Sequence, residues 1–196
     1  TAEMIRDNVL VSSGLFVDKL GGPSVKPYQP PGLWDDLTGG STSNSLKRYI
    51  MSKDGNQYRR SLYTYWKRTA PPPGMITFDA ATREYCTVER QKTSTPLQSL
   101  ILLNDPQVQG AAAEIASIVL NSQIKNDKDR IEYLHRRITG RKPSQKSLSE
   151  MINYLETIAE IHSNKKMEMS ELDIQLKSYT SLALLLYNLD ETSQKS

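Results

Sequence analysis

The sequence predicts a mainly α-helical (all-α) domain whose N-terminal half is ordered but irregular. Three observations support this fold class. From Pro96 onward, apolar residues recur at three- and four-residue spacing behind polar helix-start signals. Prolines and glycines gather at residues 21–32 and 71–73, where they disfavour regular elements. No internal repeat and no alternation of strands with helices is present, which favours an all-α class over an α/β one.

Length and composition indicate a folded chain with a substantial core. The chain has 196 residues, of which 37% are hydrophobic and 24% are charged, as expected for one globular domain. We therefore predict a single domain over residues 1–196, the C-terminal fragment of a larger protein. Residues 1–94 are expected to form a helix followed by extended and irregular segments, and residues 95–190 a helical bundle. No apolar run approaches the roughly 20 residues that a membrane span requires.

In the N-terminal half, the first residues predict a helix that ends at Gly14, a residue suited to a left-handed stop. Tyr58, Leu62 and Tyr65 lie at the spacing of one helical face, which predicts a short amphipathic helix over residues 58–69. The other expectations here are local: an extended segment over 21–32, a helical turn over 34–37, a mobile loop over 39–44, a short strand over 47–51, a turn at Asp54-Gly55, and a helical turn near 79–84.

In the C-terminal half, helix caps define the elements. Thr95 and Gln98 form a capping box around Pro96, and Asp105 precedes Pro106 in the same way. Gly140 marks the end of a further helix. Another helix and a connection over 165–169 lead to a last helix, which begins at a Ser170-x-x-Asp173 cap.

Four segments carry a family resemblance. They are GGPSVKPYQPPGLW at 21–34, YRRSLYTYWKRT at 58–69, REYCTVER at 83–90 and TPLQSLILLNDP at 95–106. Together they resemble the uncharacterised C-terminal domain of large exported planctomycete-type proteins, which commonly accompanies a cytochrome-c-like domain. The resemblance covers nearly the whole chain and implies a periplasmic or cell-envelope location in a polysaccharide-degrading context. It assigns no activity and no catalytic residue.

The basic residues are concentrated in one stretch. The net charge is only +3, but basic residues outnumber acidic ones by six between residues 46 and 92. There, cations alternate with aromatic rings that could stack on a sugar or a base. This pattern predicts a surface for an acidic glycan or a partner protein, whereas the low net charge disfavours nucleic acid. The alternative is that the rings are core residues and the cations reach from them to solvent. The candidate residues are Arg59, Arg60, Tyr63, Trp66, Lys67 and Arg68.

A second candidate lies in the stretch that combines acids, bases and a thiol. Such groups could line one half of a composite enzyme site that acts on polysaccharide and is completed by a neighbouring domain. The alternative is a set of structural bonds that hold an irregular loop, with the thiol buried. The candidate residues are Asp79, Arg83, Glu84, Cys86 and Arg90.

The metal and cofactor signals are weak. His135 is expected on a helix surface and His162 near a helix end, and neither has a second ligand at metal spacing. One cysteine excludes the paired-cysteine attachment of a c-type haem, so haem belongs, by resemblance, to an adjoining domain. We therefore expect no metal and no cofactor in this chain, and as partners the neighbouring domains of the same polypeptide. The leading hypothesis is a non-catalytic interaction module.

Overall fold

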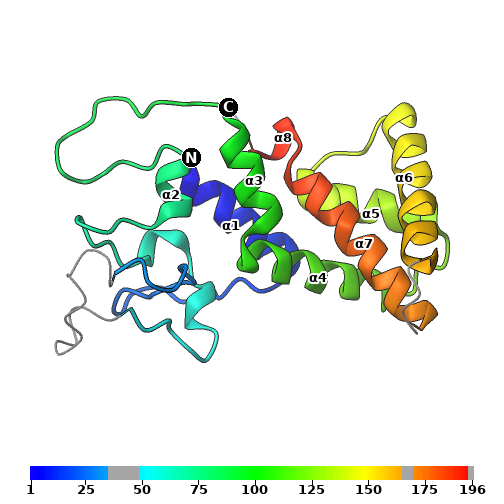
Figure 1. The fold of residues 1–196 in the computed structure, drawn as a ribbon, viewed down its shortest axis with the longest axis horizontal. Coiled ribbons are helices and arrows are strands. Elements are labelled where there is room, and N and C mark those ends of the chain that lie inside the picture. Colours follow the sequence, from blue (N-terminus) through cyan, green and yellow to red (C-terminus); the bar gives the residue numbers. More distant parts are fainter. Residues whose placement is uncertain (35–48, 165–169, 194–196) are drawn as a thin grey trace. The chain divides into compact units, whose positions relative to one another are not determined.

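The computed structural model describes residues 1–34, 49–164 and 170–193 and confirms the mainly α-helical class. Figure 1 shows helices joined by long irregular segments. Within the described ranges, the strand-like pairing consists of isolated bridges such as Val25 with Thr64, and no sheet forms. The helices are α1 (Ala2–Ser13), η2 (Asn56–Tyr58), η3 (Ser61–Tyr63), α2 (Pro73–Thr77), α3 (Pro96–Asn104), α4 (Pro106–Leu120), α5 (Asp127–Thr139), α6 (Gln145–Asn164), α7 (Glu171–Tyr187) and α8 (Asp190–Ser193).

The chain divides into two compact units. The first comprises Thr1–Leu10 and Leu15–Gln98, and the second comprises Val11–Gly14 and Ser99–Ser196. The first unit holds most of the irregular backbone, while the second consists mainly of α4 to α8. Each unit has buried apolar residues of its own.

The second unit is a helical bundle around α4 and α7, which form its most extensive helix–helix contact. Three alanines on α4 have no exposed surface, which lets α7 approach closely, and Leu182 and Leu186 of α7 are likewise fully buried. The apolar face of α5 completes this core, and Figure 1 shows α6 beside α5 and α7. The fully buried residues are Ala111, Ala112, Ile115, Ala116, Val119, Ile131, Leu134, Leu182, Ala183 and Leu186.

Three of the caps predicted in the C-terminal half are present. The Asp105 side chain accepts from the Gln107 amide at 2.7 Å, and Ser170 with Asp173 forms a complete capping box. Gly140 ends α5 with φ 77°, the left-handed conformation that glycine adopts without steric cost. Gly14 follows α1 with φ 79°, as expected. At Thr95 one of the two predicted capping-box bonds is present, from the Thr95 amide to the Gln98 side-chain oxygen at 3.3 Å.

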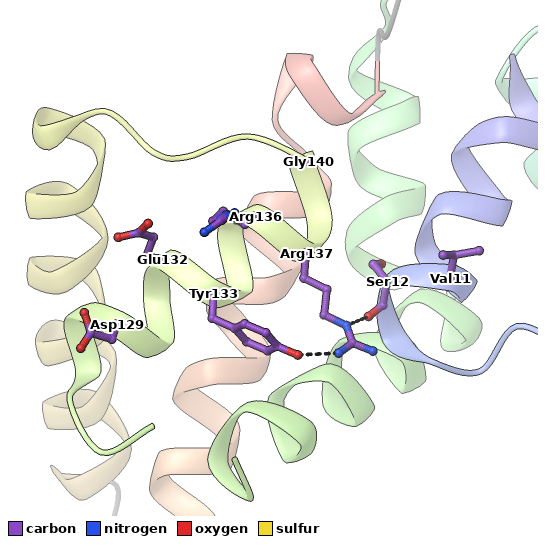
Figure 2. A pocket seen from close by; sticks show the side chains of 8 residues that line it. All are labelled: Val11, Ser12, Asp129, Glu132, Tyr133, Arg136, Arg137 and Gly140. Carbon is purple, nitrogen blue, oxygen red and sulfur yellow. Dashed lines mark hydrogen bonds between the residues drawn. The ribbon is translucent and has the colours of Figure 1, made fainter. Parts of the chain in front are cut away.

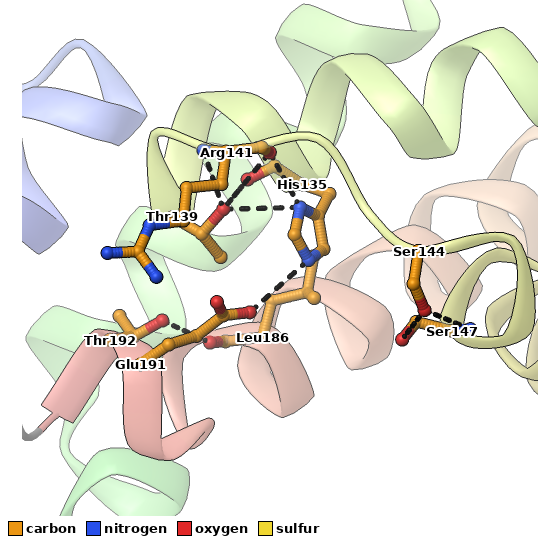
Figure 3. A network of polar contacts seen from close by, with 8 residues as sticks. All are labelled: His135, Thr139, Arg141, Ser144, Ser147, Leu186, Glu191 and Thr192. Carbon is orange, nitrogen blue, oxygen red and sulfur yellow. Dashed lines mark hydrogen bonds and ion pairs between the residues drawn. The ribbon is translucent and has the colours of Figure 1, made fainter.

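His135 does not lie on a helix surface, as predicted, but is only 4% exposed. Figure 3 shows it among polar groups from three parts of the second unit. Its Nδ1 lies 2.9 Å from the Arg141 carbonyl oxygen, and its Nε2 lies 3.5 Å from a Glu191 carboxylate oxygen. The imidazole thus joins α5 to the short α8, which the sequence analysis did not predict.

The first unit is organised around a buried arginine. Arg59 is 1% exposed, and its guanidinium donates to the carbonyl oxygens of Lys19, Gly21 and Pro23. Arg6 donates in turn to the Arg59 carbonyl at 3.0 Å. Because this backbone has no ladder of strand hydrogen bonds, side-chain donors satisfy its carbonyl groups instead. The proline- and glycine-rich segment is therefore anchored by arginine.

The predicted amphipathic helix over residues 58–69 is wrong. Two short 3₁₀ turns, η2 and η3, occupy its start, an extended stretch follows, and a turn closes at Lys67 and Ala70. The Val25 amide donates to the Tyr63 carbonyl at 2.8 Å, and the Tyr65 amide donates to the Val25 carbonyl at 2.7 Å. These bonds to a distant segment use the backbone groups that a helix would need, so tertiary pairing overrides the helical spacing.

The helical turn predicted near 79–84 is also wrong. The chain instead forms α2 just before it, with Pro73 at the first helical position. Asp79 and Arg83 adopt positive φ angles of 58° and 64°, which are incompatible with a helix. The turn at Asp54-Gly55 is present. The predictions for 35–37, 39–44, 47–48 and 165–169 lie outside the described residues, and no strand occurs at 49–51.

Candidate functional site

Two of the predicted basic and aromatic residues are part of the internal structure of the first unit. The Arg59 guanidinium is buried against backbone carbonyls. The Tyr63 hydroxyl accepts a hydrogen bond from the Gly21 amide at 2.8 Å. Both side chains therefore hold the glycine-rich segment in place. The structural alternative for this stretch expected its cations to reach solvent, and the buried Arg59 guanidinium contradicts that expectation.

The other four members of this set differ in exposure. Arg60 is exposed and pairs with Asp18 at 3.3 Å. Trp66 is half-buried and donates from its indole nitrogen to the Thr82 carbonyl at 3.1 Å. The Lys67 ammonium lies 4.1 Å from the Trp34 ring centroid, and Arg68 is exposed. Ligand binding by these four residues stays a prediction.

The residues of the predicted cleft mostly serve the loop that carries them. Asp79 accepts hydrogen bonds from the amide and hydroxyl of Thr93 at 2.7 and 2.9 Å. Arg83 lies over the Trp66 ring at 4.8 Å. Arg90 donates to Glu3 at 2.7 Å, which lowers the pKa of Glu3 against the opposing effect of its burial. These contacts hold residues 79–93 against the rest of the first unit.

The two remaining members of the cleft set are exposed. Glu84 is exposed in an irregular segment. Cys86 is a free, exposed thiol, so the expected burial of this side chain is wrong. An irregular stretch without an apolar partner element leaves its side chains in solvent, and the whole segment over 82–95 is exposed.

A pocket lies elsewhere, in the second unit. It has a volume of about 770 Å³ and is lined by one face of α5 together with the end of α1, a size typical of small-molecule sites. Figure 2 shows its lining side chains. None of them belongs to either predicted set. They are Val11, Ser12, Asp129, Glu132, Tyr133, Arg136, Arg137 and Gly140.

Arg137 is held in a fixed orientation at one end of this pocket. Its Nε donates to the Ser12 carbonyl at 2.6 Å, and its Nη1 donates to the Tyr133 hydroxyl at 2.7 Å (Figure 2). Both acceptors are neutral. Within the described part of the chain, the Arg137 guanidinium has no carboxylate within 4.0 Å. A half-buried cation is thus oriented without being neutralised.

Two further donors line the pocket from the same helix, and Figure 2 shows Arg136 extending away from Arg137. The Tyr133 hydroxyl accepts from Arg137 and so keeps its own proton for another acceptor. The exposed Arg136 also lines the pocket and forms no ion pair with any described residue. Two guanidinium groups and one hydroxyl therefore remain available to an anion.

The opposite end of the pocket is acidic. Glu132 faces Lys142, whose ammonium lies 3.4 Å from the carboxylate. Asp129 is exposed, and the described residues give it no ion pair. Acidic residues at the start of α5 and basic residues at its end also match the helix dipole. The pocket consequently has a positive end and a negative end.

Sequence reasoning missed this pocket because its halves are far apart in the chain. Ser12 and Arg137 are separated by 125 residues, and no spacing rule connects them. The adjacent arginines 136 and 137, one turn after Tyr133, are a signal that the sequence does contain.

The described residues contain no group of three or more histidine, cysteine or acidic residues placed to hold a metal ion. They also contain no helix with the length and hydropathy required to span a membrane.

Comparison with known proteins adds one finding. The family model described as "Protein of unknown function (DUF1553)", PSD1, matches residues 1–155. No curated protein and no solved structure gives a significant match. The matched range includes the first unit and the whole of α5. It therefore contains every residue that lines the pocket.

Proposed function

Because this chain belongs to the PSD1 family of proteins of unknown function (DUF1553), we propose its role from its own residues: a non-catalytic binding module. It holds a small acidic ligand in the α5 pocket, with the acidic group at the Arg136 and Arg137 end. The single observation that carries this proposal is Arg137, a half-buried guanidinium that is oriented by two neutral acceptors and has no described carboxylate partner.

Electrostatics explain why an anion would bind there. An ionised group that accepts from a guanidinium forms a charge-assisted hydrogen bond, which is roughly twice as strong as a neutral one. Arg137 loses little conformational freedom on binding because Ser12 and Tyr133 already hold it. The carboxylate of an acidic sugar and that of a peptide fit this end equally well.

A non-catalytic role is supported by the state of the predicted acid–base residues. Asp79 accepts hydrogen bonds from Thr93, and Arg90 donates one to Glu3. These side chains therefore hold their loop in place. The module would work beside neighbouring domains of its polypeptide, in the cell envelope that the planctomycete-type resemblance implies. Arg60, Trp66, Lys67 and Arg68 provide a second basic and aromatic surface for a partner domain or a glycan.

Titration with defined anions tests the proposal. Glucuronate, N-acetyltriglycine and inorganic sulfate would be added to the full chain, and binding measured by calorimetry and by NMR chemical shifts. We expect at least one of them to bind and Arg136→Gln to weaken it about tenfold, since a charge-assisted hydrogen bond contributes roughly 1.5–3 kcal/mol. Comparison of glucuronate with N-acetyltriglycine distinguishes a sugar acid from a peptide carboxylate.

Arg68→Gln is the matched control, because it removes the same charge from an exposed arginine of the first unit. Its affinity for the bound anion should equal that of the wild type. The proposal is overturned if none of the three anions binds, or if Arg136→Gln and Arg68→Gln have the same effect.

A further inference from the structure

We infer that the α5 pocket selects an elongated zwitterion, of the kind that a free tripeptide presents, with its carboxylate at Arg136 and Arg137 and its ammonium at Asp129. This inference rests on the proposed function and deepens it. The arginines would bind an anionic group at one end of the ligand, and the acidic residues of the same pocket would bind a cationic group at the other end.

The acidic half already accommodates an ammonium group. The Lys142 Nζ lies 3.4 Å from a Glu132 carboxylate oxygen, so the chain's own amine neutralises that side chain. Asp129, one turn earlier on α5, has no such partner among the described residues and also lines the pocket. An incoming amine would therefore be directed to Asp129 rather than to Glu132.

The spacing of these groups fixes the length of the ligand. Asp129 and Arg136 are seven residues apart on one helix, which places them on one face with their Cα atoms roughly 10 Å apart along its axis. An extended peptide spans about 3.5 Å per residue, so about three residues match this separation. A single amino acid is too short to reach both ends.

The remaining lining suits a peptide between the charged ends. Val11 is 55% exposed and borders the pocket, so it can cover an aliphatic stretch of the ligand. The Tyr133 hydroxyl, which accepts from Arg137, retains a proton that it can donate to a carboxylate or a peptide carbonyl. The pocket volume of about 770 Å³ accommodates a ligand of this size.

Three forms of one peptide test the inference. Triglycine carries both charges, N-acetyltriglycine lacks the ammonium, and triglycinamide lacks the carboxylate. We expect triglycine to bind about threefold more tightly than N-acetyltriglycine, the modest gain of one exposed ion pair. Triglycinamide should bind at least tenfold more weakly than triglycine.

The results separate failure of the inference from failure of the proposed function. If triglycine and N-acetyltriglycine bind equally, the ammonium site is refuted while the anion site stands. If triglycinamide binds as well as triglycine, or if no peptide form binds, the inference fails. The anion site fails with it only if glucuronate and sulfate also do not bind.

A variant of the acidic end provides the residue-level test. Asp129→Asn should abolish the advantage of triglycine and leave the affinity for N-acetyltriglycine unchanged. A general structural loss would lower both affinities, because Asp129 also lies in the first turn of α5. The matched control is Asp54→Asn, which alters an exposed aspartate of the first unit. It should change neither the affinity for triglycine nor that for N-acetyltriglycine. Retention of the triglycine advantage in Asp129→Asn overturns the assignment.

Discussion

The guanidinium carbon of Arg59 lies 4.1 Å from the centroid of the Tyr63 ring, and the same guanidinium donates to carbonyl groups of residues 19–23. A cation is thus enclosed between an aromatic face and the backbone. This arrangement assigns a structural role to an arginine that sequence patterns associate with ligand binding.

Arg59→Ala should destabilise the first unit by about 3 kcal/mol or more, since it leaves three carbonyl groups without their donor. Both tryptophans, Trp34 and Trp66, belong to this unit. Urea unfolding followed by tryptophan fluorescence therefore reports the loss. Arg60→Ala, which removes an exposed ion pair, should stay within about 1 kcal/mol of the wild type. Equal effects of the two substitutions would contradict the buried role of Arg59.

Asp105→Ala should lower the stability of the second unit by about 1 kcal/mol, because the side chain caps α4 by accepting from Gln107. Asp105→Ser keeps a capping oxygen and should recover most of the loss. Helicity measured by circular dichroism during urea unfolding tests both variants. A serine variant as unstable as the alanine variant would show that the cap is not the cause.

Burial raises the pKa of Tyr187 from 10.0 to about 12, even though Ser12 and the charge of Arg137 act in the opposite direction. A raised pKa means that the folded state favours the neutral phenol. The neutral Tyr187 phenol therefore stabilises the folded state in full below pH 10, and this stabilisation is lost as the pH rises towards 12. It amounts to about 2–3 kcal/mol.

The free energy of unfolding should therefore fall between pH 10 and 12 in the wild type. Tyr187→Phe should reduce this fall, at the cost of the hydrogen bond to Ser12. Burial and Asp127 also raise the pKa of Tyr179, so part of the alkaline slope persists in the variant. The midpoints of urea unfolding, measured across this pH range for the wild type and for Tyr187→Phe, compare the two slopes. A slope unchanged by Tyr187→Phe would refute the assignment.

His135→Leu should destabilise the second unit by roughly 1–3 kcal/mol, since the Arg141 carbonyl loses its buried imidazole partner. Glu191→Gln should cost less because the Glu191 side chain is 37% exposed. Thermal unfolding followed by circular dichroism ranks the two variants. The reverse order would place the main contribution on the ion pair rather than on the carbonyl contact.

Cys86 should react with Ellman's reagent in the folded chain at nearly the rate found in urea, because its thiol is exposed. The sequence contains a single cysteine, so the absorbance change reports this side chain alone. A native rate many times slower than the unfolded rate would indicate that the thiol is protected.

Local signals predicted the helical half of the fold well. Asp105, Gly140 and Ser170 each act within a few residues of their position, and the helices begin or end where these residues indicate. The irregular half depends on contacts that no local rule contains. Val25 pairs with the backbone of Tyr63 and Tyr65, and this pairing replaced the helix that the apolar spacing predicted.

The same reason separates what could be predicted of the site from what could not. The pair of arginines on α5 is visible in the sequence, but its orientation depends on the carbonyl of Ser12. The burial of His135 likewise depends on Arg141 and Glu191, which approach it from outside its helix. Periodicity identified the face of α5 that enters the core and gave no information about its neighbours.

The bond from Arg137 to Ser12 also bears on how the polypeptide reaches its folded state. A ribosome releases the last turn of α1 long before it has made the arginine that completes this turn, 125 residues later. Contacts so distant along the chain close late, because a long loop must first be ordered. The C-terminal turn of α1 is therefore completed only after α5 has been synthesised, and truncated chains that stop before α5 should leave this turn frayed.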